Sequence, residues 1–167
     1  MRRIVSALKY RGWEAVAGAL ADRMTGVPVP PDVGEEARLV VPMPTSASRV
    51  RARGYNQAER LAAAYASRTG RPVAGEVLRR GSAAHTQTAL QRGERRANVA
   101  RAFGVPDRFR SEVEGEHLIL VDDVWTTGAT AFAAAEALVE GGARLVSVVT
   151  AARAPLPGGT AEGEESP

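Results

Sequence analysis

The stretch LILVDDVWTTGAT, residues 118–130, sets two carboxylates directly before a turn suited to an anion. Gly128 permits a positive φ angle, and threonine hydroxyls together with the backbone amides that open the following helix can surround a phosphate with donors. Asp122 and Asp123 carry the opposite charge, and need sugar hydroxyls or a hydrated cation as partners. A polyhydroxylated, phosphorylated ligand such as a ribose 5-phosphate would satisfy both halves of the stretch.

The same residues also fit a purely structural role. Asp and Thr favour strand ends and helix caps without any ligand. The spacing does not match a Walker A loop or a dinucleotide-binding turn, so nucleotide hydrolysis through a P-loop is unsupported. Adjacent like charges at the end of a buried strand are costly, and their position beside the turn favours the ligand-binding interpretation.

Strand-like and helix-like patterns alternate around this stretch. Strands are expected at 38–44, 73–78, 102–105, 117–123 and 144–152. Helices are expected at 56–70, at 128–140 and over parts of 4–26, where a break near Gly12 is left open. The run HLILVDD shows no polar alternation, which predicts a central strand buried on both faces. The alternation predicts an α/β fold with a Rossmann-like, mainly parallel sheet flanked by helices. In such sheets ligands bind at the carboxyl ends of the strands, where the acidic pair and the turn lie.

The composition predicts a single domain over residues 1–153, followed by a disordered acidic tail over 154–167. The 167 residues are 44% hydrophobic and 25% charged, and contain no cysteine, which excludes disulfides and thiolate metal sites. The net charge is +3, but the tail carries three glutamates and no basic residue, so residues 1–153 carry +6 and suit anionic ligands. No stretch is long and apolar enough to span a membrane, so we expect a cytoplasmic protein without membrane insertion.

The stretch 118–130 resembles the ribose-phosphate-binding signature of the type I phosphoribosyltransferases. The resemblance implies that Asp122 and Asp123 bind the ribose hydroxyls, and that Mg²⁺ is held indirectly through the substrate near them. It implies that the 5-phosphate of phosphoribosyl pyrophosphate binds to Thr126, Thr127, Gly128, Ala129 and Thr130. Trp125 is unusual in this signature, and is expected either as an exposed or lid-packed aromatic or as a stacking surface at the mouth of the site.

Three further stretches are similar to the ComF-like proteins of natural transformation: ALKYRGW (7–13), VPMPTSASRVRARGYNQAERLA (41–62) and HTQTALQRGERRANVARAF (85–103). The resemblance covers residues from about 4 to 153. Most such proteins carry an N-terminal zinc segment with four cysteines, which this chain lacks, so zinc binding is not expected.

Two arginine-containing segments receive roles from the resemblance. In type I phosphoribosyltransferases a loop in the position of the second stretch binds pyrophosphate, which implies this role for Thr45, Ser46, Arg51 and Arg53. A solvated surface at a helix entry is the alternative for these arginines. The catalytic loop of the family falls between 79 and 110 and brings cations to the departing pyrophosphate, which implies catalytic roles for Arg92, Arg95 and Arg96. The alternative for this segment is a patch that binds the phosphate backbone of single-stranded DNA or RNA, while His85 is expected to be a polar loop residue.

Two functions therefore remain. The first is Mg²⁺-dependent transfer of phosphoribose from phosphoribosyl pyrophosphate to a nitrogenous acceptor, in a ComF-type role in DNA uptake. The second is a non-catalytic accessory protein of competence that senses a nucleotide or binds single-stranded DNA. The resemblance also implies a competence helicase and recombination proteins as partners, and leaves a homodimer open. The residues support the donor half of the reaction only, so the acceptor and catalysis itself stay open.

Overall fold

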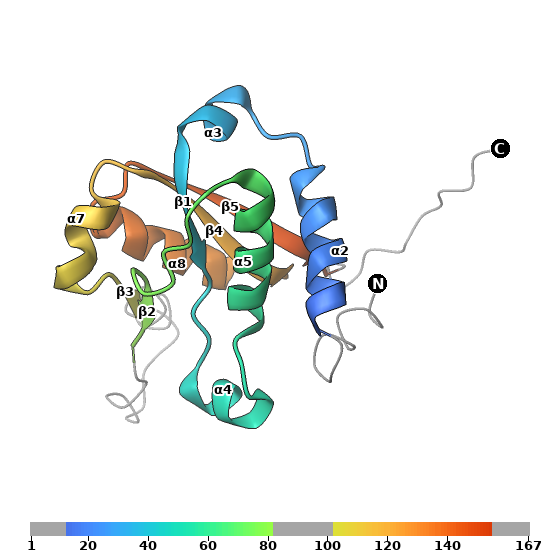
Figure 1. Cartoon of the computed structure of the whole chain (residues 1–167). Helices are drawn as coiled ribbons and strands as arrows, with labels where there is room; N and C mark the ends of the chain where they lie inside the picture. Colours follow the sequence, from blue (N-terminus) through green and yellow to red (C-terminus); the bar gives the residue numbers. More distant parts are fainter. Residues whose placement is uncertain (1–12, 82–101, 155–167) are drawn as a thin grey trace.

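A parallel three-stranded sheet forms the centre of the molecule (Figure 1). The computed structural model describes residues 13–81 and 102–154. The strands lie in the order β1-β4-β5, and both pairings are parallel. Their bounds are Ala37–Pro42 for β1, His117–Trp125 for β4 and Leu145–Arg153 for β5. Strand β4 is therefore central, as predicted.

Helices cover both faces of this sheet. Helix α8 packs on one face, whereas α5 and α2 pack together on the other. Their bounds are Trp13–Thr25 for α2, Gln57–Thr69 for α5 and Ala129–Glu140 for α8. Helix α5 begins at the N-cap Asn56 and ends at Gly70, whose φ of 67° is the left-handed conformation that glycine adopts without strain. Together with the parallel sheet, these layers confirm the predicted α/β class.

The side chains of β4 explain why the strand shows no polar alternation. Leu118 and Leu120 contribute to the core beneath α8, and Ile119 and Val121 to the core beneath α5. All four are at most 2% exposed. A strand that is buried on both faces has no place for a polar residue until it reaches the edge of the sheet.

Short elements connect the layers. They are α3 (Pro31–Glu36), α4 (Ala47–Arg53), β2 (Arg79–Arg80), β3 (Phe103–Gly104), a 3₁₀ turn η1 (Asp107–Phe109) and α7 (Arg110–Val113). Strands β2 and β3 form a separate antiparallel ribbon. Within the two described ranges, no helix is long and apolar enough to cross a membrane. The predicted tail falls largely outside those ranges, so the domain boundary stays a prediction.

The strand predicted at 73–78 is wrong. Val73 makes only an isolated parallel bridge to Val40, and the chain then turns at residues 75–76. Val77 and Leu78 are buried after the turn, at 1% and 2% exposure. Their apolar character reflects packing beneath the ribbon and not membership of the sheet.

A buried histidine lies at the opposite end of β4 from the predicted site. His117 Nε2 lies 2.9 Å from Ser147 Oγ, and Nδ1 is buried without a hydrogen-bond partner among the described residues. Burial lowers the pKa of His117, and the nearby Arg144 lowers it further. Because the folded state disfavours the charged ring, this group removes stability as the pH falls through its ordinary range.

Replacing Leu120 by alanine should lower the free energy of unfolding by about 3 kcal/mol, because a fully buried leucine of the central strand leaves a cavity. Leu145→Ala on β5 is the matched control, since Leu145 is 38% exposed and should cost less than about 1 kcal/mol. Equilibrium denaturation in urea measures both. Equal losses would mean that β4 is not the packed centre of the fold.

Candidate functional site

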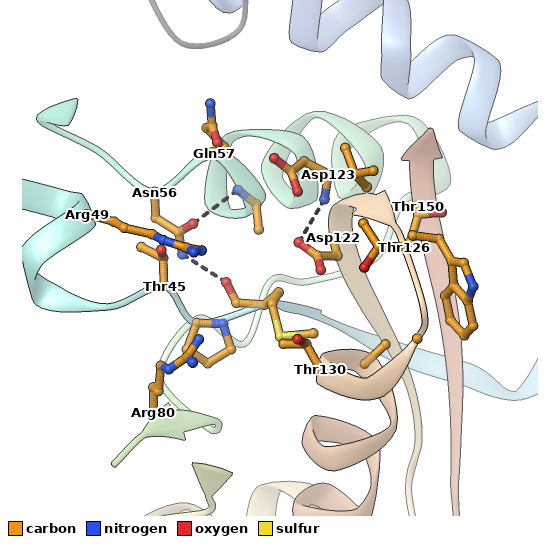
Figure 2. Close-up of a pocket in the computed structure, with 17 residues that line it drawn as sticks. Thr45, Arg49, Asn56, Gln57, Arg80, Asp122, Asp123, Thr126, Thr130 and Thr150 are labelled. Atoms are coloured by element: carbon orange, nitrogen blue, oxygen red, sulfur yellow. Dashed lines mark hydrogen bonds between the residues drawn. The ribbon is translucent and has the colours of Figure 1, made fainter. Parts of the chain in front are cut away.

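A cavity of about 400 Å³ opens at the carboxyl ends of β1 and β4 (Figure 2). Parallel strands end at the same edge of the sheet, so the segment after β1, the start of α5 and the turn before α8 meet there. The charged lining residues are Arg49, Arg80, Asp122 and Asp123. Hydroxyl and amide side chains in the lining come from Thr45, Asn56, Gln57, Thr126, Thr130 and Thr150.

The Asp122 carboxylate interacts closely with the neighbouring Asp123. The backbone amide of Asp123 donates a hydrogen bond of 2.8 Å to Asp122 Oδ1. Burial raises the pKa of Asp122 to about 7, and the adjacent charge of Asp123 adds to the rise, while Arg49 opposes it. Near neutral pH the Asp122 carboxyl is therefore only partly ionised, and a cation or hydroxyl donors from a ligand would favour its ionised form.

The turn that follows leads into α8 without a capping side chain. Gly128 has a φ of 80° and occupies the N-cap of α8, where it has no side chain to cap the helix. The Ala129 amide makes a long contact of 3.4 Å with Thr127 Oγ1. The first-turn amides of α8 are therefore left largely to solvent or to a ligand. Thr126, Gly128 and Thr130 line the cavity, whereas Thr127 and Ala129 are not in its lining.

The residues predicted for pyrophosphate binding are only partly at the cavity. Thr45 lines it, and Ser46 Oγ caps α4 by accepting a hydrogen bond of 3.4 Å from the Arg49 amide. Arg51 is exposed and does not line the cavity, and the side chain of Arg53 lies outside what the structure describes. These four roles stay predictions.

Arg49 takes the position at the cavity that the sequence suggested for Arg51. Two residues along a helix are about 200° apart, so only one of the pair can face the cavity. The helix phase, which depends on where α4 begins, selects Arg49. A sequence interpretation that treats the segment as an irregular loop cannot make this choice.

Arg80 was missed as a specific site residue, although it belongs to the arginine-rich segment noted in the sequence. It lies on β2, and its guanidinium stacks over the Phe103 ring of β3 at 5.3 Å from the centroid. Neither Arg80 nor Arg49 makes an ion pair with the described carboxylates. Six other described arginines pair with carboxylates: Arg38 with Glu116, Arg68 with Asp22, Arg79 and Arg108 with Glu76, Arg110 with Asp107, and Arg144 with Glu36. Within the part of the chain that the structure describes, the charge of the two cavity arginines is not neutralised by an ion pair and can face an anion.

Asn56 ties two walls of the cavity together. It is 6% exposed, and its Oδ1 accepts a hydrogen bond of 3.1 Å from the Ala58 amide at the start of α5. Its Nδ2 donates to the Met43 carbonyl at 3.0 Å, directly after β1. The sequence predicted the helix cap but not the second bond, because only the folded chain brings Met43 beside the cap.

The predicted catalytic residues Arg92, Arg95 and Arg96 lie outside the described residues, as does His85. Strands β2 and β3 flank that segment, and Arg80 of β2 lies in the cavity lining.

The sequence is similar to bacterial proteins named for competence and DNA use. It is 32% identical over 155 residues to the DNA utilization protein YhgH of Salmonella typhi, which covers 87% of this chain and 63% of YhgH. It is 31% identical over 144 residues to the competence protein ComFC of Bacillus subtilis (strain 168), which covers 85% of this chain and 55% of ComFC. These proteins are homologues of the chain. The chain spans less than two thirds of their length, and no family model matches it.

Solved structures with the same architecture identify the fold. The allosteric regulatory enzyme of purine biosynthesis aligns with a TM-score of 0.54 and 23% identity, covering 83% of this chain and 26% of that enzyme. The glutamine phosphoribosylpyrophosphate amidotransferase from B. subtilis gives 0.54 and 22% over the same shares. The chain has the type I phosphoribosyltransferase fold. This finding and the homologues confirm the predicted fold and the ComF resemblance.

Asp122→Asn should reduce the dependence of stability on pH. In the wild type, Asp122 ionises with a raised pKa in the folded state but is already ionised in the unfolded chain, so the free energy of unfolding should fall by about 2 kcal/mol between about pH 5.5 and about pH 8.5. The difference in the free energy of unfolding between wild type and variant at each pH isolates the contribution of Asp122. The contribution of His117, which has the opposite sign, is present in both proteins and cancels.

Urea denaturation across this pH range measures the difference. Asp107→Asn is the control, since the Asp107 side chain is 95% exposed, and it should keep the wild-type pH dependence. An Asp122→Asn profile parallel to that of the wild type would show that Asp122 does not titrate near neutral pH.

Gly128→Ala should cost more stability than Gly70→Ala, although both glycines are left-handed. A Cβ at Gly128 would lie 2.4 Å from Trp125 Cζ2, whereas a Cβ at Gly70 meets nothing within 4 Å. We expect Gly70→Ala to lower the free energy of unfolding by about 1 kcal/mol, because of left-handed strain alone. We expect Gly128→Ala to lower it by at least about 2 kcal/mol, because the clash adds to that strain. Thermal and urea unfolding of the two variants test this, and equal losses would argue against the close contact with Trp125.

Proposed function

We propose that the chain binds phosphoribosyl pyrophosphate together with Mg²⁺ in the cavity at the carboxyl edge of the sheet. The observation that carries the proposal is the distribution of charge around this cavity. The acidic pair and the phosphate turn follow one another along β4 and α8, while Arg49 and Arg80, without described ion pairs, add positive charge from other elements. A ligand with a sugar between two anionic groups matches this arrangement.

Each part of the ligand has a partner in the proposal. The amides at the start of α8 bind the 5-phosphate, since a helix N-terminus favours negative charge. Asp122 and Asp123 accept hydrogen bonds from the ribose hydroxyls. Arg49 and Arg80 bind the pyrophosphate, with Thr45 as an additional donor.

The residues present fit a magnesium ion that is held mainly by the substrate. Among the described residues no group of three potential metal ligands occurs, so the protein alone does not form a closed metal site. Mg²⁺ usually keeps several waters and binds through one or two carboxylates plus substrate phosphates. Burial and the adjacent charge of Asp123 raise the pKa of Asp122, and a nearby cation would offset both effects, which supports this fit. Bound there, Mg²⁺ neutralises charge on the pyrophosphate.

The reaction consistent with such a ligand is phosphoribosyl transfer. The bond between C1 of the ribose and the pyrophosphate oxygen breaks, the pyrophosphate leaves with the electron pair, and a bond forms between C1 and a nitrogen of the acceptor. Cations beside the leaving group stabilise this step, and we assign that role to Arg80 together with the predicted Arg92, Arg95 and Arg96.

The names of the homologues favour a biological role in DNA uptake or use. YhgH is named a DNA utilization protein and ComFC a competence protein. We propose the same setting for this chain, in the cytoplasm, with a competence helicase and recombination proteins as partners. These names also favour a second function, in which the chain binds single-stranded DNA or a nucleotide without catalysis.

Titration calorimetry with phosphoribosyl pyrophosphate and Mg²⁺ tests the proposal. Arg49→Ala and Arg80→Ala should each weaken binding by about tenfold or more, because each removes charge-assisted hydrogen bonds to an anion. Arg51→Ala is the matched control on the same helix as Arg49, and should bind like the wild type because Arg51 does not line the cavity.

Two results would contradict the proposal: no binding by the wild type, or equal weakening by Arg51→Ala and Arg49→Ala. A parallel titration with a single-stranded oligonucleotide separates the second function. Binding of the oligonucleotide that weakens steeply with salt, without binding of phosphoribosyl pyrophosphate, would favour the accessory role.

A further inference from the structure

We propose that Trp125 and Phe132 are positioning residues that hold the phosphate turn in its binding conformation before any ligand arrives. The proposal rests on the proposed function in one respect, since the turn at 126–130 is taken as the phosphate site. Trp125 belongs to the lining of the cavity, and the proposal assigns its indole the further role of holding the turn through Gly128.

The indole of Trp125 lies directly against Gly128. A Cβ built on this glycine would lie 2.4 Å from Cζ2 and 2.9 Å from Cη2 of the indole. Because these distances are far below van der Waals contact, the ring occupies the space where any other residue would place its side chain. The glycine supplies the left-handed φ of 80°, and the indole restricts the space into which the turn can move.

Phe132 closes the same contact from the first turn of α8. Its ring meets that of Trp125 edge to face, with centroids 5.7 Å apart and an interplanar angle of 75°. Phe132 Cε2 lies 3.0 Å from the Cβ position built on Gly128, and the Phe132 amide donates a hydrogen bond of 2.8 Å to the Gly128 carbonyl. Two rings and one backbone hydrogen bond therefore converge on one residue of the turn.

The sheet provides a rigid base for the indole. Trp125 is the last residue of β4, where it pairs with Arg153 of β5, and its carbonyl accepts a hydrogen bond of 2.8 Å from the Ala154 amide. Its side chain also packs against the core beneath α8. Because Trp125 is fixed to the sheet, its contact with Gly128 fixes the turn relative to the edge of the sheet.

The exposure of Phe132 separates this role from ordinary core packing. Phe132 is 61% exposed, so a large ring faces water and contributes little buried area. Its edge-to-face contact with Trp125 explains why a large aromatic residue is present at this exposed position. The interaction free energy of such aromatic pairs is typically about 0.5 to 1.5 kcal/mol. Because preorganisation reduces the entropy lost on binding, this corresponds to about a two- to tenfold effect on phosphate affinity.

The test compares Phe132→Ser with Val139→Ser, a substitution of another exposed apolar residue of α8. Val139 is 51% exposed and takes no part in the contact with Gly128. Two measurements are made: affinity for inorganic phosphate and for ribose 5-phosphate by calorimetry, and ¹⁵N order parameters of residues 128–130 in the ligand-free protein. The third variant is Trp125→Phe, which replaces the indole by a smaller aromatic ring.

We expect Phe132→Ser to weaken both probes by about two- to tenfold and to lower the order parameters of 128–130 from about 0.85 towards 0.6. Trp125→Phe should act in the same direction, and Val139→Ser should match the wild type in both measurements. A melting temperature of Phe132→Ser close to that of Val139→Ser would exclude general destabilisation as the cause.

The proposal is overturned if the order parameters of 128–130 are the same in the wild type, Phe132→Ser and Trp125→Phe, or if those variants bind phosphate as the wild type does. If the wild type binds neither phosphate nor ribose 5-phosphate, the proposed function fails. The order parameters then still decide whether the two aromatic residues hold the turn.

Discussion

Two adjacent carboxylates at the end of a strand buried on both faces are the constraint on which the rest of the site depends. Asp122 is sufficiently buried, and sufficiently close to Asp123, that its pKa rises to about 7. The surrounding elements offer positive charge at the same edge: Arg49 from α4, Arg80 from β2 and the amides at the start of α8. Parallel pairing is what makes this possible, because it brings the ends of β1 and β4 to one edge of the sheet.

Much of the fold follows from patterns that are local in the sequence. The run of β4 predicts burial on both faces, and Asn56 and Gly70 mark the ends of α5, because caps depend on only a few neighbouring residues. The structure of the segment around Val77 and Leu78 could not be predicted from such local patterns. Apolar residues predict burial, but burial after a turn and burial within a strand give the same short pattern, and tertiary packing selects between them.

The candidate site also has a part that is local in the sequence and a part that only the fold brings together. The acidic pair and the turn are contiguous in sequence, so their proximity needs no knowledge of the fold. The cationic part is assembled from distant segments: Arg49 faces the cavity through the phase of α4, and Arg80 through the position of the β2–β3 ribbon. Neither position follows from residue type, because arginines are frequent throughout the chain. The contact of Trp125 with Phe132 likewise depends on how α8 leaves the turn.

Two helices of similar length begin at the cavity, and their different caps explain why an anion would select one of them. At α5, the Asn56 side chain accepts a hydrogen bond from the Ala58 amide and holds the Met43 carbonyl, so this end is tied into the protein. At α8, the N-cap is Gly128, which has no side chain to offer. Both ends carry the positive pole of a helix dipole, but the N-cap side chain that covers the start of α5 has no counterpart at the start of α8. The aromatic contact behind Gly128 keeps this open end in place without occupying the donors, which is the property that a phosphate site requires.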